Sequence, residues 1–202
     1  MQKNISLKPD FSYEKKVGGV ILGVDEVGRG CVAGPVIVAG IILNNNIDTS
    51  QINDSKKLSP GKREKIFNYL KEHCQYLIKS SSVEEIEEIN ILQASLLAMR
   101  RVINNIEHKF DYVFVDGNIS PDKSMNNIKT IVGGDNKSLS IAAASIFAKV
   151  ARDKLMDELD KDYPDYLWKQ NKGYCTKQHI DAIRKFGITP YHRKSFLKKI
   201  IS

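Results

Sequence analysis

The chain has 202 residues, 42% of them hydrophobic and 27% charged, which is an ordinary composition for a globular protein with one full core. Its formal net charge of +7 fits a polyanionic partner and fits plain solubility equally well. The longest apolar run, 36–43, is too short to cross a bilayer and the N-terminal stretch is polar, so we expect neither a membrane protein nor a secreted one. The cysteines, Cys31, Cys74 and Cys175, are odd in number and form no C-x-x-C pair, which favours a reduced, cytoplasmic setting.

Along the chain, residues 1–17 are polar and are expected to form a loose lead-in. After them, β-branched runs predict strands over about 19–25, 35–43, 76–81, 112–115 and 128–132. Apolar residues at helical spacing predict helices over about 60–73, 83–103, 138–160 and 176–186. Ser59 before Pro60 is a typical helix start, and the alanines 142–144 would allow the third helix to pack closely on a sheet.

The order of these elements predicts the fold class. Leading strands followed by helices that alternate with further strands favour one mixed α/β sheet of five strands flanked by helices. No linker rich in Pro, Gly or Ser divides the chain, so we expect one domain over residues 1–202 that ends in a helical segment over about 164–202. We expect this domain to be a monomer.

The stretch 21–34, ILGVDEVGRGCVAG, concentrates the residues with chemical function. A buried strand ends there in two acids, and a loop follows in which glycines let the backbone approach another molecule closely. We interpret the stretch as a metal site beside a phosphate site, and we call residues 28–30 the glycine loop. The simpler alternative is a β-hairpin whose loop happens to carry charge. The candidate residues are Asp25, Glu26, Gly28, Arg29 and Gly30.

Two known phosphate-binding motifs are excluded in this stretch. A P-loop needs Lys followed by Ser or Thr after its second glycine, and that pair is missing. Gly28, Gly30 and Ala33 fit the dinucleotide pattern G-x-G-x-x-[GA], which must open a helix. The run 36–43 that follows is β-branched and predicts a strand instead.

The two adjacent acids pose a geometric difficulty. Neighbouring side chains of a regular strand point to opposite faces of the sheet, so Asp25 and Glu26 can share a site only if the strand ends or bends between them. We therefore predict that Asp25 occupies the last regular position of its strand. A strand that continues through Val27 would weaken the case for a shared site.

Two further acids follow predicted strands. Asp116 comes directly after the strand over 112–115, where open α/β sheets place their chemistry, but it also begins a D-G turn. Asp135 follows Gly133 and Gly134, and it would equally favour the N-terminus of the next helix. The residues alone leave both alternatives open.

Six spaced motifs occur in the order GVDEVGRG with AGPV, DSKKLS, VDGN, GGD followed by SIAAASIFAKVARD, KGY-x-T, and HRKSF. From Gly23 to Phe196 this pattern resembles the ribonuclease HII family. The resemblance implies an RNase H-like fold and hydrolysis of the RNA strand of RNA–DNA hybrids. It also implies cutting 5′ of single ribonucleotides in duplex DNA, which leaves 3′-hydroxyl and 5′-phosphate ends and serves the removal of ribonucleotides and RNA primers.

The resemblance also assigns roles to residues. It implies four catalytic carboxylates that hold two divalent ions, Mn²⁺ or Mg²⁺, namely Asp25, Glu26, Asp116 and Asp135. Hard ions prefer oxygen ligands, which agrees with acids in the absence of a histidine or cysteine cluster. The glycine loop would contact the 2′-hydroxyl and adjacent phosphates, and Tyr174 would pack against the deoxyribose 3′ to the ribonucleotide. Further implied contacts to the nucleic acid backbone are Lys56, Lys57, Lys137, Ser138 and Lys172.

Some alternatives remain beside this resemblance. The ribonuclease HIII family fits less well, because it carries an extra N-terminal domain and typically lacks the Arg and Tyr seen here. A junction resolvase of the same fold would share the acids but need no reader of the 2′-hydroxyl. A non-catalytic binding module would have no evident use for the four acids.

Individual residues also differ from the family pattern or have a simpler role. Val27 and Cys31 stand where Ala and Pro are commoner in the family. His192 and Arg193 have packing of the C-terminal tail as a simple alternative role.

Overall fold

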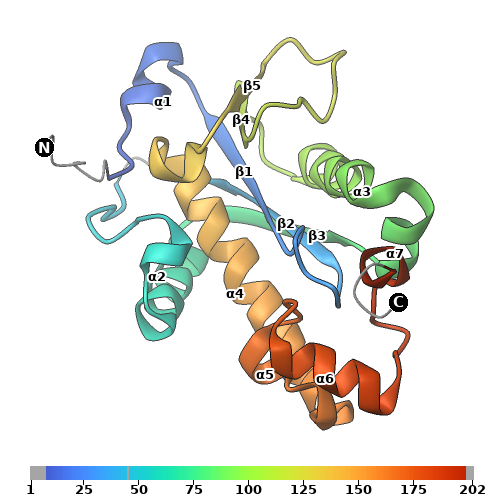
Figure 1. Cartoon of the computed structure of the whole chain (residues 1–202). Coiled ribbons are helices and arrows are strands. Elements are labelled where there is room, and N and C mark those ends of the chain that lie inside the picture. The colour runs from blue at the N-terminus through green and yellow to red at the C-terminus, as the bar shows by residue number, and fades with distance from the viewer. Residues whose placement is uncertain (1–7, 45, 199–202) are drawn as a thin grey trace, which may run out of the picture.

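The computed structural model describes residues 8–44 and 46–198. Their strands form one five-stranded sheet with the order β3-β2-β1-β4-β5 (Figure 1). The strands are β1 Ile21–Val27, β2 Val36–Ile42, β3 Gln75–Ser81, β4 Tyr112–Asp116 and β5 Ile128–Ile131. Strand β2 is antiparallel to both β1 and β3, whereas β1, β4 and β5 run parallel. The predicted mixed five-stranded sheet is confirmed.

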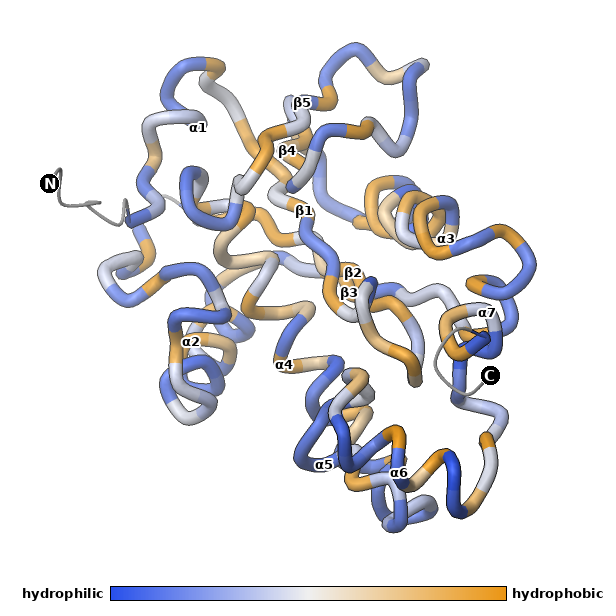
Figure 2. The backbone as a smooth tube through the Cα atoms, viewed as in Figure 1, coloured by the Kyte–Doolittle hydropathy of each residue, from blue (hydrophilic) through white to orange (hydrophobic). Residues whose placement is uncertain are grey.

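Helices cover both faces of this sheet. Helix α3, Val83–Asn105, packs on one face, against Leu22, Val38 and Val113 among others. Helices α2, Pro60–His73, and α4, Leu139–Asp162, pack on the other face. In Figure 2 the hydrophobic stretches gather in the central strands and adjoining helices, and the loop between β4 and β5 is mostly hydrophilic. The sheet therefore lies between two apolar layers, and the side chains of its central strands point alternately into one and the other.

The long helices begin where their caps predict. The Ser59 hydroxyl accepts a hydrogen bond from the Lys62 N–H, with Pro60 at the first helical position of α2. Helix α3 begins with a capping box between Ser82 and Glu85. Helix α4 lies so close to β1 that a Cβ on Gly23 would collide with the backbone of Ser140. The close packing expected of the alanine-rich helix is thus observed.

The prediction of a loose lead-in is wrong for its last third. Residues Ser12–Val17 form helix α1, and residues 1–7 lie outside the described part of the chain. The helix is anchored by Glu14, whose Oε1 accepts hydrogen bonds from the Ser138 hydroxyl (2.6 Å) and the Ser140 N–H (3.0 Å). A helix of six residues has no apolar periodicity to reveal it, and this one is fixed by a buried polar contact to the start of α4.

Short helices make up the last part of the chain that the structure describes. They are η3 Pro164–Tyr166, α5 Trp168–Asn171, α6 Lys177–Phe186 and α7 Lys194–Leu197. Trp168 is the largest fully buried side chain of this segment, and it packs with Tyr166 and Ile183. Two single-turn helices, η1 Ser55–Lys57 and η2 Gly134–Asn136, lie before α2 and α4. Within the described residues, no helix is both long enough and apolar enough to cross a membrane.

Candidate active site at the carboxyl end of the sheet

The candidate acids meet where two parallel neighbouring strands end. Strands β1 and β4 are in register up to Val24 beside Val115, so the next residues, Asp25 and Asp116, follow at the same edge of the sheet. Asp116 is the last residue of β4, and its Oδ1 accepts a hydrogen bond of 2.7 Å from the N–H of Gly134. This bond connects the end of β4 to η2, which carries Asp135.

The predicted end of β1 at Asp25 is wrong. The strand continues to Val27, because β1 stays paired with β2 as far as Val27 beside Ile37. Its pairing with β4, however, ends at Val24. Beyond that residue β1 is supported on one side alone, and the edge that β4 leaves is open.

Strand alternation assigns the acids to the two faces of the sheet. Asp25 has the parity of Ile21, which packs with α4, whereas Glu26 has the parity of Val24, which packs with α3. The Glu26 carboxylate nonetheless senses the charge of Asp116, which contributes to the rise of its pKa. The continuation of β1 through Val27 weakens the case for a site that Asp25 and Glu26 share through the strand itself, and the link between the two faces is the charge of Asp116, which raises the pKa of both acids.

Burial and mutual repulsion define the electrostatics of this cluster. Burial raises the pKa of Asp25 well above its usual value, and the charges of Glu26, Asp116 and Asp135 raise it further. Burial also raises the pKa of Glu26, an effect that Arg29 opposes. The pKa of Asp116 is raised by burial and by Asp135, against the hydrogen bond from the Gly134 N–H. The four acids therefore create a strongly negative site.

The side chains fit hard divalent cations. The Oε2 atom of Glu26 is buried without a hydrogen-bond partner among the described residues, which is costly unless a ligand satisfies it. Asp135 is 5% exposed and accepts one hydrogen bond from the Asn136 side chain, while Lys56 Nζ lies 3.5 Å from its Oδ2. Across residues 8–44 and 46–198, no group of three or more His, Cys, Asp or Glu forms a ready-made site for one ion. The acids face one another as repelling groups rather than as a closed ligand shell.

The glycine loop lies beside the acids. Arg29 is about half exposed, and its Nη1 lies 3.2 Å from Glu26 Oε1. Gly28 has φ +97°, and a Cβ there would collide with Arg152, so the fold itself requires this glycine. Gly30 differs, because φ is not positive there and a Cβ would meet no described atom within 4 Å. The fold does not require a glycine at position 30, which leaves open space beside the loop.

Two buried arginines that the sequence analysis did not place in the site hold the connection between β1 and β2. Arg152 donates to the carbonyl oxygens of Pro35 (3.2 Å), Ala33 (2.8 Å) and Lys172 (2.7 Å). Arg193 donates to Gly34 O (2.7 and 2.9 Å) and Arg29 O (3.1 Å), so the packing role proposed for it is what the structure shows. A charged residue on the otherwise apolar inner face of α4 was the available signal for Arg152.

Tyr174 lies on a loop that is joined to this connection. The carbonyl of Gly173 accepts hydrogen bonds from the N–H groups of Val32 (2.9 Å) and Ala33 (3.2 Å). The Tyr174 side chain is 42% exposed, and Lys149 Nζ lies 5.9 Å from its ring centroid. The residue with this exposed aromatic ring is thus joined through its neighbour Gly173 to the segment that follows the glycine loop.

The residues predicted to contact the nucleic acid backbone divide into two groups. Lys56, Lys57 and Lys137 are exposed around η2, and they contact Asp135, Asn136 and the Val132 carbonyl, respectively. Lys172 instead pairs with Asp157. Ser138 is fully buried, because its hydroxyl caps α4 and donates to Glu14. The last two side chains are used within the fold, so we leave them out of the substrate surface.

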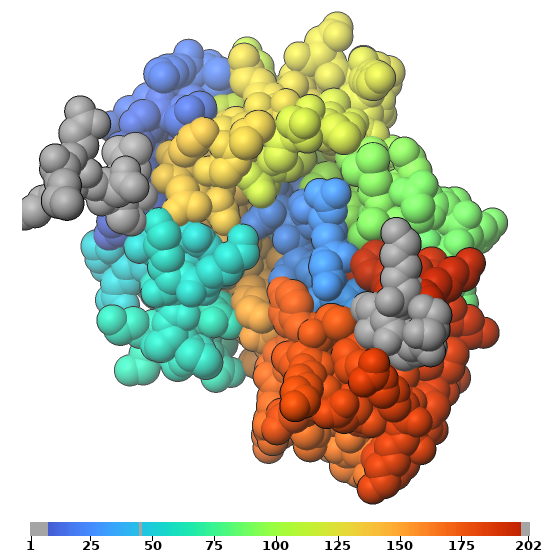
Figure 3. All heavy atoms as spheres, viewed as in Figure 1, coloured from blue at the N-terminus to red at the C-terminus, as the bar shows by residue number. Residues whose placement is uncertain are grey.

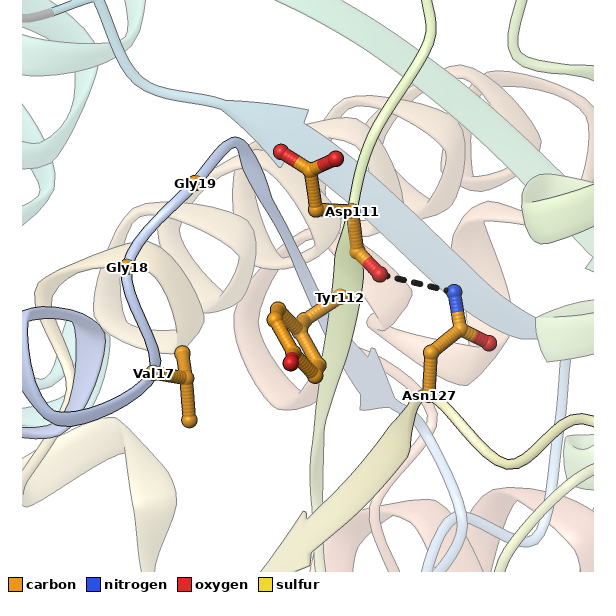
Figure 4. Close-up of a pocket in the computed structure, with 6 residues that line it drawn as sticks. All are labelled: Val17, Gly18, Gly19, Asp111, Tyr112 and Asn127. Carbon is orange, nitrogen blue, oxygen red and sulfur yellow. Dashed lines mark hydrogen bonds between the residues drawn. The ribbon is translucent and has the colours of Figure 1, made fainter.

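The face of the molecule seen in Figure 3 is hollowed between α2 and the C-terminal segment, and α4 forms the floor of this hollow. A different pocket, of about 490 Å³, lies at the other end of β1 and is lined by Gly19, Asp111, Tyr112 and Asn127 among others (Figure 4). Two of its polar side chains have partners within the fold: the Asn127 amide donates to the backbone carbonyl of Asp111 (2.9 Å), and the Asp111 carboxylate accepts a hydrogen bond from the Val20 N–H (2.7 Å). This second pocket has no feature of a reactive site.

Comparison with known proteins agrees with this geometry. A family model described as Ribonuclease HII matches residues 22–199. Ribonuclease HII of Wolbachia sp. subsp. Brugia malayi (strain TRS) is 52% identical over 189 residues, which cover 93% of each chain. The crystal structure of ribonuclease H2 from Pyrococcus horikoshii OT3 is 25% identical, with a TM-score of 0.74 over 90% of this chain and 97% of that chain. Bst-RNase HIII in complex with Mn²⁺ shares the fold at 15% identity, with a TM-score of 0.73 over 87% of this chain and 66% of that one. The chain therefore belongs to the ribonuclease HII family, and it is an endoribonuclease of the ribonuclease H type.

Proposed function

We propose that this endoribonuclease cuts duplex DNA on the 5′ side of a single embedded ribonucleotide, as well as the RNA strand of longer RNA–DNA hybrids. It would leave 3′-hydroxyl and 5′-phosphate ends and serve the removal of ribonucleotides and RNA primers. One observation carries the proposal: acids from two parallel strands gather at one open edge beside the glycine loop, with Arg29 on Glu26. A hairpin whose loop merely happens to carry charge would not need an acid from the end of a neighbouring parallel strand beside it.

The four acids are proposed to hold two divalent ions, Mn²⁺ or Mg²⁺. Their oxygen-only donors, the unsatisfied Glu26 Oε2 and the mutual repulsion at Asp25 support this proposal. When bound, such ions activate the attacking water and neutralise charge on the leaving oxygen. The structural relative Bst-RNase HIII was solved with Mn²⁺, which is consistent with a hard-ion site in this fold. The residues concerned are Asp25, Glu26, Asp116 and Asp135.

The glycine loop is proposed to read the ribose. Because Gly30 has open space where a Cβ would stand, a sugar can approach its backbone closely. Arg29 is exposed enough to donate to a phosphate while it stays near Glu26. A site that hydrogen-bonds the 2′-hydroxyl can reject deoxyribose strongly, by about 10⁴-fold, because its polar groups are then left unpaired.

Tyr174 is proposed to pack against the deoxyribose on the 3′ side of the ribonucleotide. Its ring is exposed, and the Gly173 hydrogen bonds join its loop to the segment that follows the glycine loop, which supports a role in selecting an RNA-to-DNA junction. Lys56, Lys57 and Lys137 are proposed to contact phosphates, so binding should weaken as salt rises. The three cysteines, unpaired in the structure, fit a reducing cytoplasm.

The decisive experiment compares duplexes of one sequence that carry no ribonucleotide, one ribonucleotide or a full RNA strand, with Mn²⁺ or Mg²⁺ and with the cut positions mapped. We expect no cut in all-DNA and a single cut 5′ of the lone ribonucleotide. Equal cleavage of all-DNA would indicate a resolvase-like nuclease, and binding without cleavage would indicate a binding module.

A second test isolates the ribose reader. Gly30→Ala should leave the melting temperature unchanged, because a methyl group fits there, and should still lower cleavage by blocking the approach of the sugar. Gly61→Ala is the matched control, since a Cβ there also meets no described atom within 4 Å and the residue lies in α2. Full activity in Gly30→Ala would contradict a close approach at the glycine loop.

A further inference from the structure

Two imidazole rings lie against each other in the core of the C-terminal segment. His179 of α6 and His192, which lies before α7, are 0% and 1% exposed, and their Nε2 atoms are 3.1 Å apart. Trp168 and Tyr166 pack around them. Neither imidazole contacts the acids, so the proposed chemistry at the sheet edge does not explain the pair.

The hydrogen-bond partners determine the tautomer of each ring. The backbone N–H of Thr189 can only donate, and it lies 2.9 Å from His192 Nδ1, so neutral His192 carries its proton on Nε2. The indole N–H of Trp168 donates to His179 Nε2 at 2.9 Å, which makes that atom an acceptor. His192 Nε2–H therefore points at the same His179 Nε2, whose single lone pair it shares with the indole N–H, and the proton of His179 is on Nδ1.

The chain of hydrogen bonds ends at the backbone of Tyr174. The Nδ1–H of His179 donates to the Tyr174 carbonyl oxygen, 2.8 Å away. At its other end, His192 forms a β-bridge with Ala33, in the connection that follows the glycine loop. The two histidines thus span from the β1–β2 connection to the residue that presents the exposed aromatic ring.

We propose that His179 and His192 are positioning residues that hold Tyr174 at the correct distance from the glycine loop, and that this distance sets the preference for a ribonucleotide followed by DNA. The inference rests on the proposed role of Tyr174. Two buried imidazoles with one defined proton order specify a single backbone position, which apolar side chains of similar volume would not do. If the hydrogen bond from His179 to the Tyr174 carbonyl is lost, Tyr174 can move, and its ring is then misplaced on the sugar.

The two nitrogens of His179 can be tested separately. In His179→Asn the side-chain amide can take the place of Nδ1–H and still donate to the Tyr174 carbonyl, whereas the acceptor for Trp168 is lost. In His179→Gln the amide oxygen can take the place of Nε2, whereas the donor to Tyr174 is lost. Both variants disturb the buried cluster, so each serves as the stability control for the other.

The measurement is kcat and KM on a single-ribonucleotide duplex and on a uniform RNA–DNA hybrid, with melting temperatures for each variant. We expect His179→Gln to lose about tenfold in the ratio of kcat/KM between the two substrates, which is the effect of one hydrogen bond. His179→Asn should keep the wild-type ratio. An equal loss of the ratio in both variants, or no loss in either, would overturn the positioning role.

Two further measurements separate this inference from the proposed function and from failure to fold. Tyr174→Ala should abolish the wild-type preference; a wild type without any preference would overturn the proposed function itself. Nitrogen chemical shifts of the unmodified protein report the tautomers without any substitution. A proton on His179 Nε2 or on His192 Nδ1 at neutral pH would overturn the inference even if neither His179 variant folds.

Discussion

The acid cluster and the histidine pair are both buried and polar, but they treat their polar atoms in opposite ways. At the sheet edge, Glu26 Oε2 has no partner among the described residues, and burial and like charges raise the pKa of Asp25. In the C-terminal segment, all four ring nitrogens of His179 and His192 have a partner. The first arrangement is costly until a ligand arrives, and the second is complete in itself. Glu14 Oε2 in α1 is also buried without a partner in the described part of the chain, so it is the combination of an unpaired oxygen with clustered like charges that marks the binding site.

The largest effect should come from removing a charge at the sheet edge. Asp116→Asn keeps the shape of the side chain but loses the charge that a divalent ion needs, and metal-assisted charge stabilisation amounts to several kcal/mol. We expect cleavage to fall by about 10³-fold or more, with an unchanged circular dichroism spectrum and a melting temperature no lower than that of wild type. Asp122→Asn, in the exposed β4–β5 loop, is the control, and retained cleavage in Asp116→Asn would mean that the cluster is not the active site.

In the scaffold, a comparable substitution should reduce stability instead. Arg193→Ala would leave the buried carbonyl oxygens of Arg29 and Gly34 unsatisfied, at a cost of about 3–5 kcal/mol in the free energy of unfolding. Urea denaturation would measure this loss, with the exposed Arg184→Ala as the control, expected within about 0.5 kcal/mol of wild type. A loss below about 1 kcal/mol in Arg193→Ala would contradict its role in fixing the loop.

The stability that the buried histidine pair contributes should also depend on pH. Burial, followed by the charge of His179, lowers the pKa of His192 from 6.5 to about 4, so the folded protein keeps this ring neutral where the unfolded chain protonates it. The stability it contributes is complete above pH 6.5 and is lost as the pH falls from 6.5 to about 4, on the order of 3 kcal/mol in total. Chemical denaturation at several pH values should show this slope in wild type and in the exposed-site control His108→Asn. The slope should be shallower in His192→Asn.

The smallest effect is a gain of stability at the binding site. Because the folded-state pKa of Asp25 lies above the ordinary 3.8, its ionisation destabilises the metal-free fold as the pH rises above that value. Asp25→Asn should therefore raise the melting temperature of the metal-free protein at pH 7 by about 2–4 °C, or about 1 kcal/mol. Added Mn²⁺ should stabilise wild type and affect the variant less. A lower melting temperature in Asp25→Asn would show that the acids do not strain the fold.

Much of the fold could be predicted from local signals. Strand and helix bounds agree to within a few residues because caps such as Ser59 and Ser82 and the apolar period of α4 act over one or two turns. Helix α1 could not be predicted, since Glu14 gains its role from Ser138, which is 124 residues away in the chain. The end of β1 was misplaced because pairing with β2 extends beyond pairing with β4, a difference that no local pattern encodes.

In the candidate site, the motif residues could be predicted from the sequence, but the partners of other polar side chains could not. The acids and the glycine loop stand in short motifs, and the order of the strands brings them to one edge. Whether a polar side chain faces the substrate or the core depends on distant partners, which is why Ser138 and Lys172 could not be told from Lys56 in advance. Arg152 is the clearest residue that was missed, because its three carbonyl partners are separated in the chain and become neighbours only after folding.

The contact between Gly28 and Arg152 has a consequence for sequence change in this family. The guanidinium occupies the space that any side chain at position 28 would need, while it bonds the carbonyls of Ala33 and Pro35. A larger residue at 28 therefore displaces the arginine, and a shorter residue at 152 frees three carbonyls. Each step alone should therefore lower the stability of the fold, although the two positions lie 124 residues apart in the chain.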